Sequence, residues 1–214
     1  MRPGLDVRLA FCELNTPNLV DMLNHLPGTT SVAVVTPLLL ANAYHARIDI
    51  PRQIAGCGVT ERGLDVRQSP VLGEDHRLVS LMRQRVAELG VSRLDDRVGV
   101  LVVAIGSSDP AANARTAHVA PKLLAGTRWA GATTAFATRP EPSLAEAVAR
   151  LRRRGARRVV IAPWFLAPGR LPDRVRSFAH DADIAMAEPL GAHRLVAETV
   201  LDRFDAVAVQ RIAA

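Results

Sequence analysis

The sequence predicts an α/β protein of two homologous halves, each a small doubly wound parallel sheet flanked by helices. Three observations support this: an internal repeat, short apolar runs that alternate with amphipathic segments, and a composition that can fill a core. The chain has 214 residues, 49% hydrophobic and 22% charged, which is enough for one large domain or two small ones. This composition excludes an intrinsically disordered chain.

The internal repeat divides the chain into two copies. The matching segments are 10–26 with 135–151, 34–49 with 160–173, and 69–79 with 187–196. Their order is the same in both copies, as expected for a duplicated unit. We therefore predict an N-terminal half at residues 1–92 and a C-terminal half at 98–214, joined by a polar linker at about 90–97.

Short apolar runs predict the strands. They lie at 5–11, 32–36, 64–68, 98–105, 132–137, 158–162 and 183–187. The runs are continuous rather than alternating, which is typical of parallel strands covered on both faces.

Amphipathic segments between these runs predict the helices. Residues 143–153 begin with Ser143 as an N-cap, and residues 75–89 begin at Asp75. The apolar positions that share one helix face are Leu144, Ala147, Val148 and Leu151 in the first, and Leu78, Leu81, Met82 and Leu89 in the second. Strand alternating with helix predicts the doubly wound arrangement.

The two copies differ in length, and the first is predicted to be truncated. The second opens with the strand at 98–105, a loop (GSSDP, 106–110) and a helix, whereas Met1 aligns with Gly126, beyond all three. Such a first strand is usually central in the sheet, and losing it would expose two sheet edges. We expect the natural product to be longer than this chain, with a start codon assigned too far downstream. An exposed edge would also favour a homo-oligomer.

The charge is positive and is carried by arginine. The net charge is +6, and Lys122 is the only lysine. An arginine fork suits carboxylates and phosphates, although codon usage in a GC-rich genome is an alternative explanation. Aromatic residues make up only 4% and do not interleave with the basic ones, so we expect no nucleic-acid partner.

Several absences predict a cytoplasmic protein that does not bind a membrane. No apolar stretch approaches the roughly 18 residues of a membrane span, and the N-terminus has no apolar signal-peptide region. The two cysteines, Cys12 and Cys57, form neither a CxxC motif nor a zinc spacing. A reducing compartment is the simplest interpretation.

Residues that only one copy carries are the candidates for catalysis or metal binding, because residues shared by both copies are expected to serve folding. Glu13 aligns with Thr138, and His45 aligns with Gly169. Both lie just past the carboxyl ends of predicted strands, where open α/β sheets bind ligands. An imidazole and a carboxylate can hold a divalent metal or move a proton, although a solvated loop histidine is the alternative.

Asp49 aligns with Asp173, so both copies carry an aspartate here, which favours a structural role for it. We expect it to be the N-cap of a helix that starts near Pro51. Alternatively it orients His45.

Three segments of the first copy together resemble one known family, the sirohydrochlorin chelatases, which are small class II tetrapyrrole chelatases. They are AFCELNTPNL, PLLLANAYHARIDIP and SPVLGEDHRLV. The combination Phe-x-Glu, Pro-Leu-x-Leu and His-x-x-x-Asp-x-Pro is specific to that family. The resemblance covers nearly the whole chain, in the two-copy arrangement of the longer bacterial members.

The resemblance implies a chelatase that inserts ferrous or cobaltous ion into sirohydrochlorin, for sirohaem or cobalamin synthesis. It implies that His45 and Glu13 are the catalytic, metal-contacting residues, that the metal is a substrate, and that no prosthetic group is needed. The substrate carries eight carboxylates, and Arg47 is our candidate for positioning it.

The sequence departs from the family pattern at one point. The family's other metal-site histidine lies in a Gly-His-Gly-Ser/Thr motif that this sequence lacks, and Ser107 of the second copy stands at the matching place. This departure leaves an alternative open: a non-catalytic tetrapyrrole- or metal-binding protein derived from the chelatases.

Overall fold

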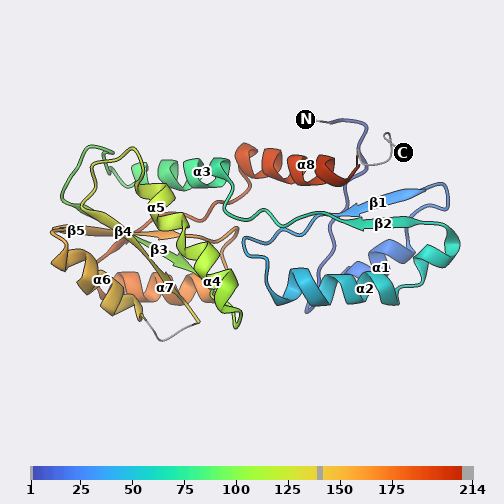
Figure 1. Cartoon of the computed structure of the whole chain (residues 1–214), viewed down its shortest axis with the longest axis horizontal. Coiled ribbons are helices and arrows are strands. Elements are labelled where there is room, and N and C mark those ends of the chain that lie inside the picture. The colour runs from blue at the N-terminus through green and yellow to red at the C-terminus, as the bar shows by residue number, and fades with distance from the viewer. Residues whose placement is uncertain (1, 139–141, 209–214) are drawn as a thin grey trace.

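A computed structural model describes residues 2–138 and 142–208 as two α/β halves that lie side by side (Figure 1). The ends of the predicted halves, residues 1 and 209–214, and residues 139–141 of the second repeat lie outside this range. No helix in the described ranges is both long and apolar enough to cross a membrane.

The first half contains a two-stranded parallel sheet. Its elements are α1 (Leu19–Asn24), β1 (Val32–Val35), a π-helical turn η1 (His45–Asp49), α2 (Ile50–Gly56), a 3-10 turn η2 (Val59–Arg62), β2 (Asp65–Gln68) and α3 (His76–Ala87). β1 pairs with β2, in register from Val32 opposite Asp65 to Val35 opposite Gln68.

The second half contains a four-stranded parallel sheet in the order β4-β3-β5-β6. Its elements are β3 (Val98–Ala104), α4 (Pro110–Ala117), α5 (Val119–Leu124), β4 (Gly131–Phe136), α6 (Leu144–Arg153), β5 (Arg158–Pro163), α7 (Arg170–Asp181), β6 (Ala185–Met186) and α8 (Arg194–Ala208). β3 is central, and every one of its residues is buried. Side chains of α3 and α5 cover one face of this sheet, and those of α6 and α7 cover the other.

The α/β prediction is confirmed, as are six of the seven strands in the part of the chain that the structure describes. The strand predicted at 5–11 is wrong: this segment makes one isolated bridge, between Phe11 and Asn18. Its counterpart in the second half, β4, pairs with β3, and the first half has no described counterpart of β3. The backbone at 5–11 therefore has no neighbouring strand, and Val7 and Leu9 remain 78% and 59% exposed.

The predicted helix starts are confirmed. The Ser143 hydroxyl accepts from the backbone N–H of Glu146, whose carboxylate accepts from the Ser143 backbone, a complete capping box. Asp75 caps α3 by accepting from the backbone N–H of Arg77.

The last helix of each repeat packs across to the other half. α3, from the first repeat, buries Leu81 and Met82 in the core cluster that holds β3 and β5. α8, from the second repeat, packs against α3 and reaches β1, along the same side of the molecule as α3 (Figure 1). This exchange of terminal helices, in which α3 and α8 each pack onto the other half, joins the halves through side chains far apart in the sequence.

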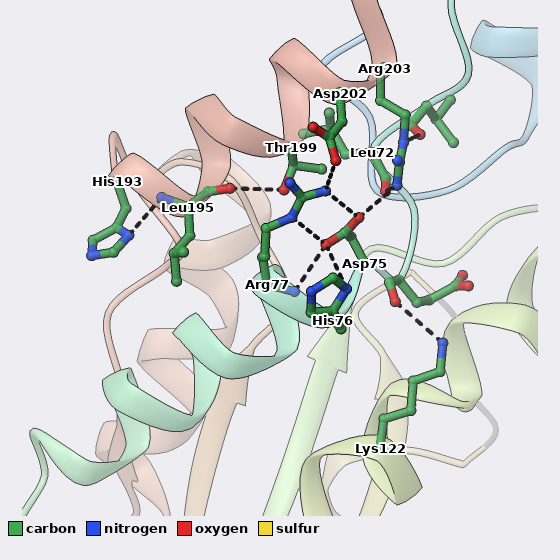
Figure 2. Close-up of polar contacts among 12 residues, drawn as sticks. Leu72, Asp75, His76, Arg77, Lys122, His193, Leu195, Thr199, Asp202 and Arg203 are labelled. Carbon is green, nitrogen blue, oxygen red and sulfur yellow. Dashed lines mark hydrogen bonds and ion pairs between the residues drawn. The ribbon is translucent and has the colours of Figure 1, made fainter. Parts of the chain in front are cut away.

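A buried ionic network fixes this exchange (Figure 2). Asp75 is only 7% exposed, and its carboxylate accepts from the guanidinium groups of Arg77 on α3 and Arg203 on α8. Arg77 also pairs with Asp202 of α8, and Arg203 donates to the backbone carbonyl of Leu72 at 2.9 Å. Burial alone would raise the pKa of Asp75, but the hydrogen bonds from Arg77 and Arg203 outweigh it and hold that pKa well below its ordinary value.

Candidate functional site

Glu13 lies on a tight turn that follows the irregular segment at 5–11. The backbone N–H of Phe11 donates to the carbonyl of Pro17 at 2.9 Å and closes the turn, and the next residue, Asn18, caps α1. The amide of Gln53, on α2, donates to the backbone carbonyl of Cys12 at 2.9 Å. This contact holds the Glu13 turn against the helical segment that begins with His45.

His45 is the first residue of the π-helical turn η1, which continues directly into α2. The backbone N–H of Ile50 donates to the His45 carbonyl, five residues back. Ala46 is buried, and its carbonyl accepts from the Gln68 amide at the end of β2 at 2.7 Å. A single π-helical turn is frequent at functional sites. Here it fixes the imidazole beside the carboxyl ends of β1 and β2.

The structure brings His45, Glu13 and Asp49 together. The His45 Nε2 atom lies 3.3 Å from Glu13 Oε1 and 3.7 Å from Asp49 Oδ2. The side chains of His45 and Glu13 are 50% and 64% exposed, whereas that of Asp49 is 23% exposed. One imidazole nitrogen thus faces two carboxylates at an accessible surface.

Asp49 does not cap a helix, contrary to the first of our two expectations. It has helical backbone angles and makes no side-chain capping hydrogen bond, because η1 already carries the helix up to Ile50. Its carboxylate instead points to His45, the alternative that we left open. A carboxylate beside an imidazole can fix the orientation and basicity of the ring.

The thiol of Cys12 borders this group and is electrically neutral. Burial raises the pKa of Cys12, a hydrogen bond from Gln53 lowers it, and the nearby charges of Asp49 and Glu13 raise it further. A thiol that keeps its proton is a poor metal ligand.

Imidazole nitrogen and carboxylate oxygen are suitable donors for divalent iron or cobalt. Over residues 2–138 and 142–208, however, no group of three or more His, Cys, Asp and Glu side chains has an arrangement that could hold a metal ion. The described chain therefore provides an imidazole and two carboxylates that can contact a cation, but not a closed cage around one.

The positions of the second half that align with Glu13 and His45 supply neither a carboxylate nor an imidazole. Thr138, the counterpart of Glu13, donates its hydroxyl hydrogen to the Ile105 carbonyl at 2.6 Å, and Gly169, the counterpart of His45, offers no side chain. Ser107, in the GSSDP loop, accepts a hydrogen bond from the backbone N–H of Asp109, which caps α4. The matching positions of the second half therefore lack the imidazole and the carboxylate.

Arg47 points across to the second half. Its Nη1 atom lies 3.4 Å from Asp109 Oδ2, and its side chain is 62% exposed. Next to it, Arg115 of α4 donates to the backbone carbonyl of Asn42 at 3.1 Å. Sequence reasoning did not find the roles of Asp109 and Arg115, because only the packing of the halves brings them beside the His45 segment.

Comparison with known proteins identifies the family. The CbiX family model matches residues 1–89 and 99–207. The chain belongs to the CbiX family. Among curated relatives, the sirohydrochlorin ferrochelatase of Priestia megaterium is 29% identical over 180 residues, covering 82% of this chain and 67% of the relative. The sirohydrochlorin cobaltochelatase of the same organism is 27% identical over 173 residues, covering 79% of this chain and 56% of the relative.

Solved structures share the fold of this CbiX-family chain. SirB from Bacillus subtilis with Fe3+ superposes with a TM-score of 0.81 at 22% identity, covering 95% of this chain and 82% of that one. SirB from Bacillus subtilis subspecies spizizenii in complex with cobalt superposes with a TM-score of 0.75 at 20% identity, covering 95% and 81%. These likenesses confirm the predicted class II chelatase architecture.

Proposed function

We propose that this chain is a sirohydrochlorin chelatase that inserts ferrous or cobaltous ion into the tetrapyrrole, with His45 and Glu13 as the catalytic residues. The observation that carries the proposal is the 3.3 Å approach of His45 Nε2 to Glu13 Oε1, found in one half only of a CbiX-family chain. Relatives named for either metal are similar to it, so both ions belong to the proposal.

The chemistry requires a group that contacts the metal and groups that accept protons. A divalent ion that enters the ring replaces two pyrrole N–H protons, which must leave the macrocycle. A neutral imidazole can contact the ion or accept a proton near neutral pH, and a carboxylate adds negative charge and a second acceptor. His45 and Glu13 would fill these roles, with Asp49 orienting the imidazole and Arg47 holding a substrate carboxylate. The metal ion is substrate, and no prosthetic group takes part.

We also propose a cytoplasmic location. The support is chemical: Cys12 and Cys57 are both free thiols, as expected in a reducing compartment.

The experiment is a metallation assay with Fe2+ or Co2+, in which the absorbance change of sirohydrochlorin measures the rate. The parent chain should exceed the rate in protein-free buffer, and Glu13→Gln should lower the catalysed rate by about 100-fold, the scale for loss of one acid–base group. A parent rate equal to the buffer rate would rule out catalysis by this chain.

A second candidate function is binding without turnover. It is favoured by the lack, in the described residues, of a group of three side chains arranged to hold a metal ion. A tetrapyrrole- or metal-binding protein would retain sirohydrochlorin or Co2+ in equilibrium dialysis while the metallation rate stayed at the buffer value. Metallation above that rate would exclude it.

A further inference from the structure

Two polar contacts join the halves at the surface next to His45. One runs from Arg47 to Asp109, and the other from Arg115 to the backbone carbonyl of Asn42. They connect the loop after β1 and the turn η1 with the loop after β3 and helix α4. The carboxyl ends of β1 and β3 therefore face a common surface.

The contact between Arg47 and Asp109 is weak. Arg47 meets Asp109 through one nitrogen at 3.4 Å, at a solvent-exposed position, where such pairs contribute about 0–1 kcal/mol. The other Asp109 oxygen, Oδ1, already accepts from the backbone N–H of Ala111 to cap α4. By contrast, Arg77 binds Asp75 through two nitrogens at a part-buried position. Both Arg47 and Arg115 retain N–H groups that could bind a carboxylate in two-pronged fashion.

Large apolar side chains are exposed on the same segments. They are Leu38, Tyr44, Ile48 and Ile105. Tyr44 and Ile48 flank His45 and Arg47 in the sequence, and Ile105 begins the loop that carries Asp109. These side chains stand on the segments that carry His45, Arg47 and Asp109, so they are available to contact the apolar part of a ligand held there.

This combination fits a flat ring with an apolar face and an anionic rim. Resting on the proposed function, we propose that Arg47 and Arg115 bind peripheral carboxylates of the tetrapyrrole while the apolar side chains of this surface contact its ring, so that substrate replaces the contacts with Asp109 and Asn42. Arg47 stands two residues from His45, so a ring held here lies beside the metal-contacting pair. Arg115 makes the second half part of the substrate site although it carries no catalytic group.

The test measures binding without chemistry. Uroporphyrin, a metal-free porphyrin with eight carboxylates, is titrated against the intact chain and its own fluorescence is followed. Arg47→Ala and Arg115→Ala should each weaken binding about 10-fold or more, the scale for losing hydrogen bonds to a charged group. Arg174→Ala removes the same charge from an exposed position on α7 and should change binding less than about 2-fold.

A second variant separates substrate binding from a purely structural role. Asp109→Asn keeps an N-cap oxygen on α4 but removes the competing charge from Arg47. If Arg47 serves substrate, this variant should bind uroporphyrin a few-fold more tightly than the parent. If Arg47 merely joins the halves, the variant should bind no more tightly.

The outcomes separate this inference from the proposed function. Arginine-dependent uroporphyrin binding by a chain that never metallates would support the site and exclude the chelatase. Metallation by the parent, with arginine variants that bind uroporphyrin within about 2-fold of it, would overturn the site and leave the chelatase. A parent chain that does not bind uroporphyrin would also overturn the site.

Discussion

The two halves share one repeat but divide its tasks. The second half has a four-stranded sheet around β3, a strand with no exposed residue, and carries neither Glu13 nor His45. In its described residues the first half pairs β1 with β2 alone, has an irregular segment where the second half has β4, and carries the Glu13–His45 pair. The larger sheet and the proposed catalytic pair therefore lie in different copies, and helices α3 and α8 connect the two.

The largest stability effect should come from breaking that connection. Asp75→Asn removes the carboxylate shared by the part-buried guanidinium groups of Arg77 and Arg203, although Arg77 keeps its pair with Asp202, and we expect it to cost about 3 kcal/mol of unfolding free energy. Urea titration at neutral pH measures it. Asp181→Asn, at an exposed position, is the control and should cost less than about 0.5 kcal/mol. An equal cost for both variants would show that the network does not fix the exchange.

The loss of unfolding free energy caused by Asp75→Asn should depend on pH. Because the folded-state pKa of Asp75 is lowered, its contribution is complete above the unfolded-state pKa of about 4 and is lost as pH falls below it. The stability difference between the parent and Asp75→Asn should therefore shrink on acidification from about pH 5 towards pH 3. A difference that grows on acidification would contradict the sign of this shift.

Core truncations should sharpen the contrast between the halves. Leu101→Ala removes a fully buried side chain from the centre of the second half and should cost about 4 kcal/mol. Leu19→Ala in α1, packed into a smaller core cluster beside a two-stranded sheet, should cost about 2 kcal/mol. Equal costs, measured by urea unfolding, would mean that the first half is as well packed as the second.

Hydrogen exchange should locate the weaker half directly. Amides of β3 lie between two paired strands, whereas β1 pairs on one side only in the described chain. We expect amides of β1 to exchange about 100-fold faster than those of β3, as local opening frees them first. Similar protection in both strands would remove the basis of the comparison.

The smallest effect concerns Cys12. Burial raises its thiol pKa, so iodoacetamide should modify it more slowly at pH 8 than it modifies a free cysteine in solution. Peptide mapping by mass spectrometry measures the rate. Faster modification than the free amino acid would mean that the thiol is not shielded.

Much of the fold could be predicted from local patterns in the sequence. The helix start at Ser143 and the strand β3 follow from a capping residue and a continuous apolar run, which depend on near neighbours. Residues 5–11 have the composition of a strand and still do not form one, because no strand lies beside them in the described residues. Pairing is a long-range property that composition cannot supply.

The candidate site was predictable only in part, because some of its contacts depend on how the halves pack. Comparing the copies singled out Glu13 and His45, and the structure places their side chains in contact. Asp49 was ambiguous because its role depends on whether a helical turn precedes α2, and the π-helical turn decided it. Arg115 was invisible because only the docking of the halves brings α4 to the loop after β1.

The most direct test of the account is the metallation rate of His45→Ala beside that of His180→Ala, whose side chain is exposed on α7 in the other half. We predict a loss of about 100-fold or more for His45→Ala, and a rate within about 2-fold of the parent for His180→Ala. If His45→Ala metallated sirohydrochlorin as fast as the parent, the chemistry would not reside at the His45–Glu13 pair.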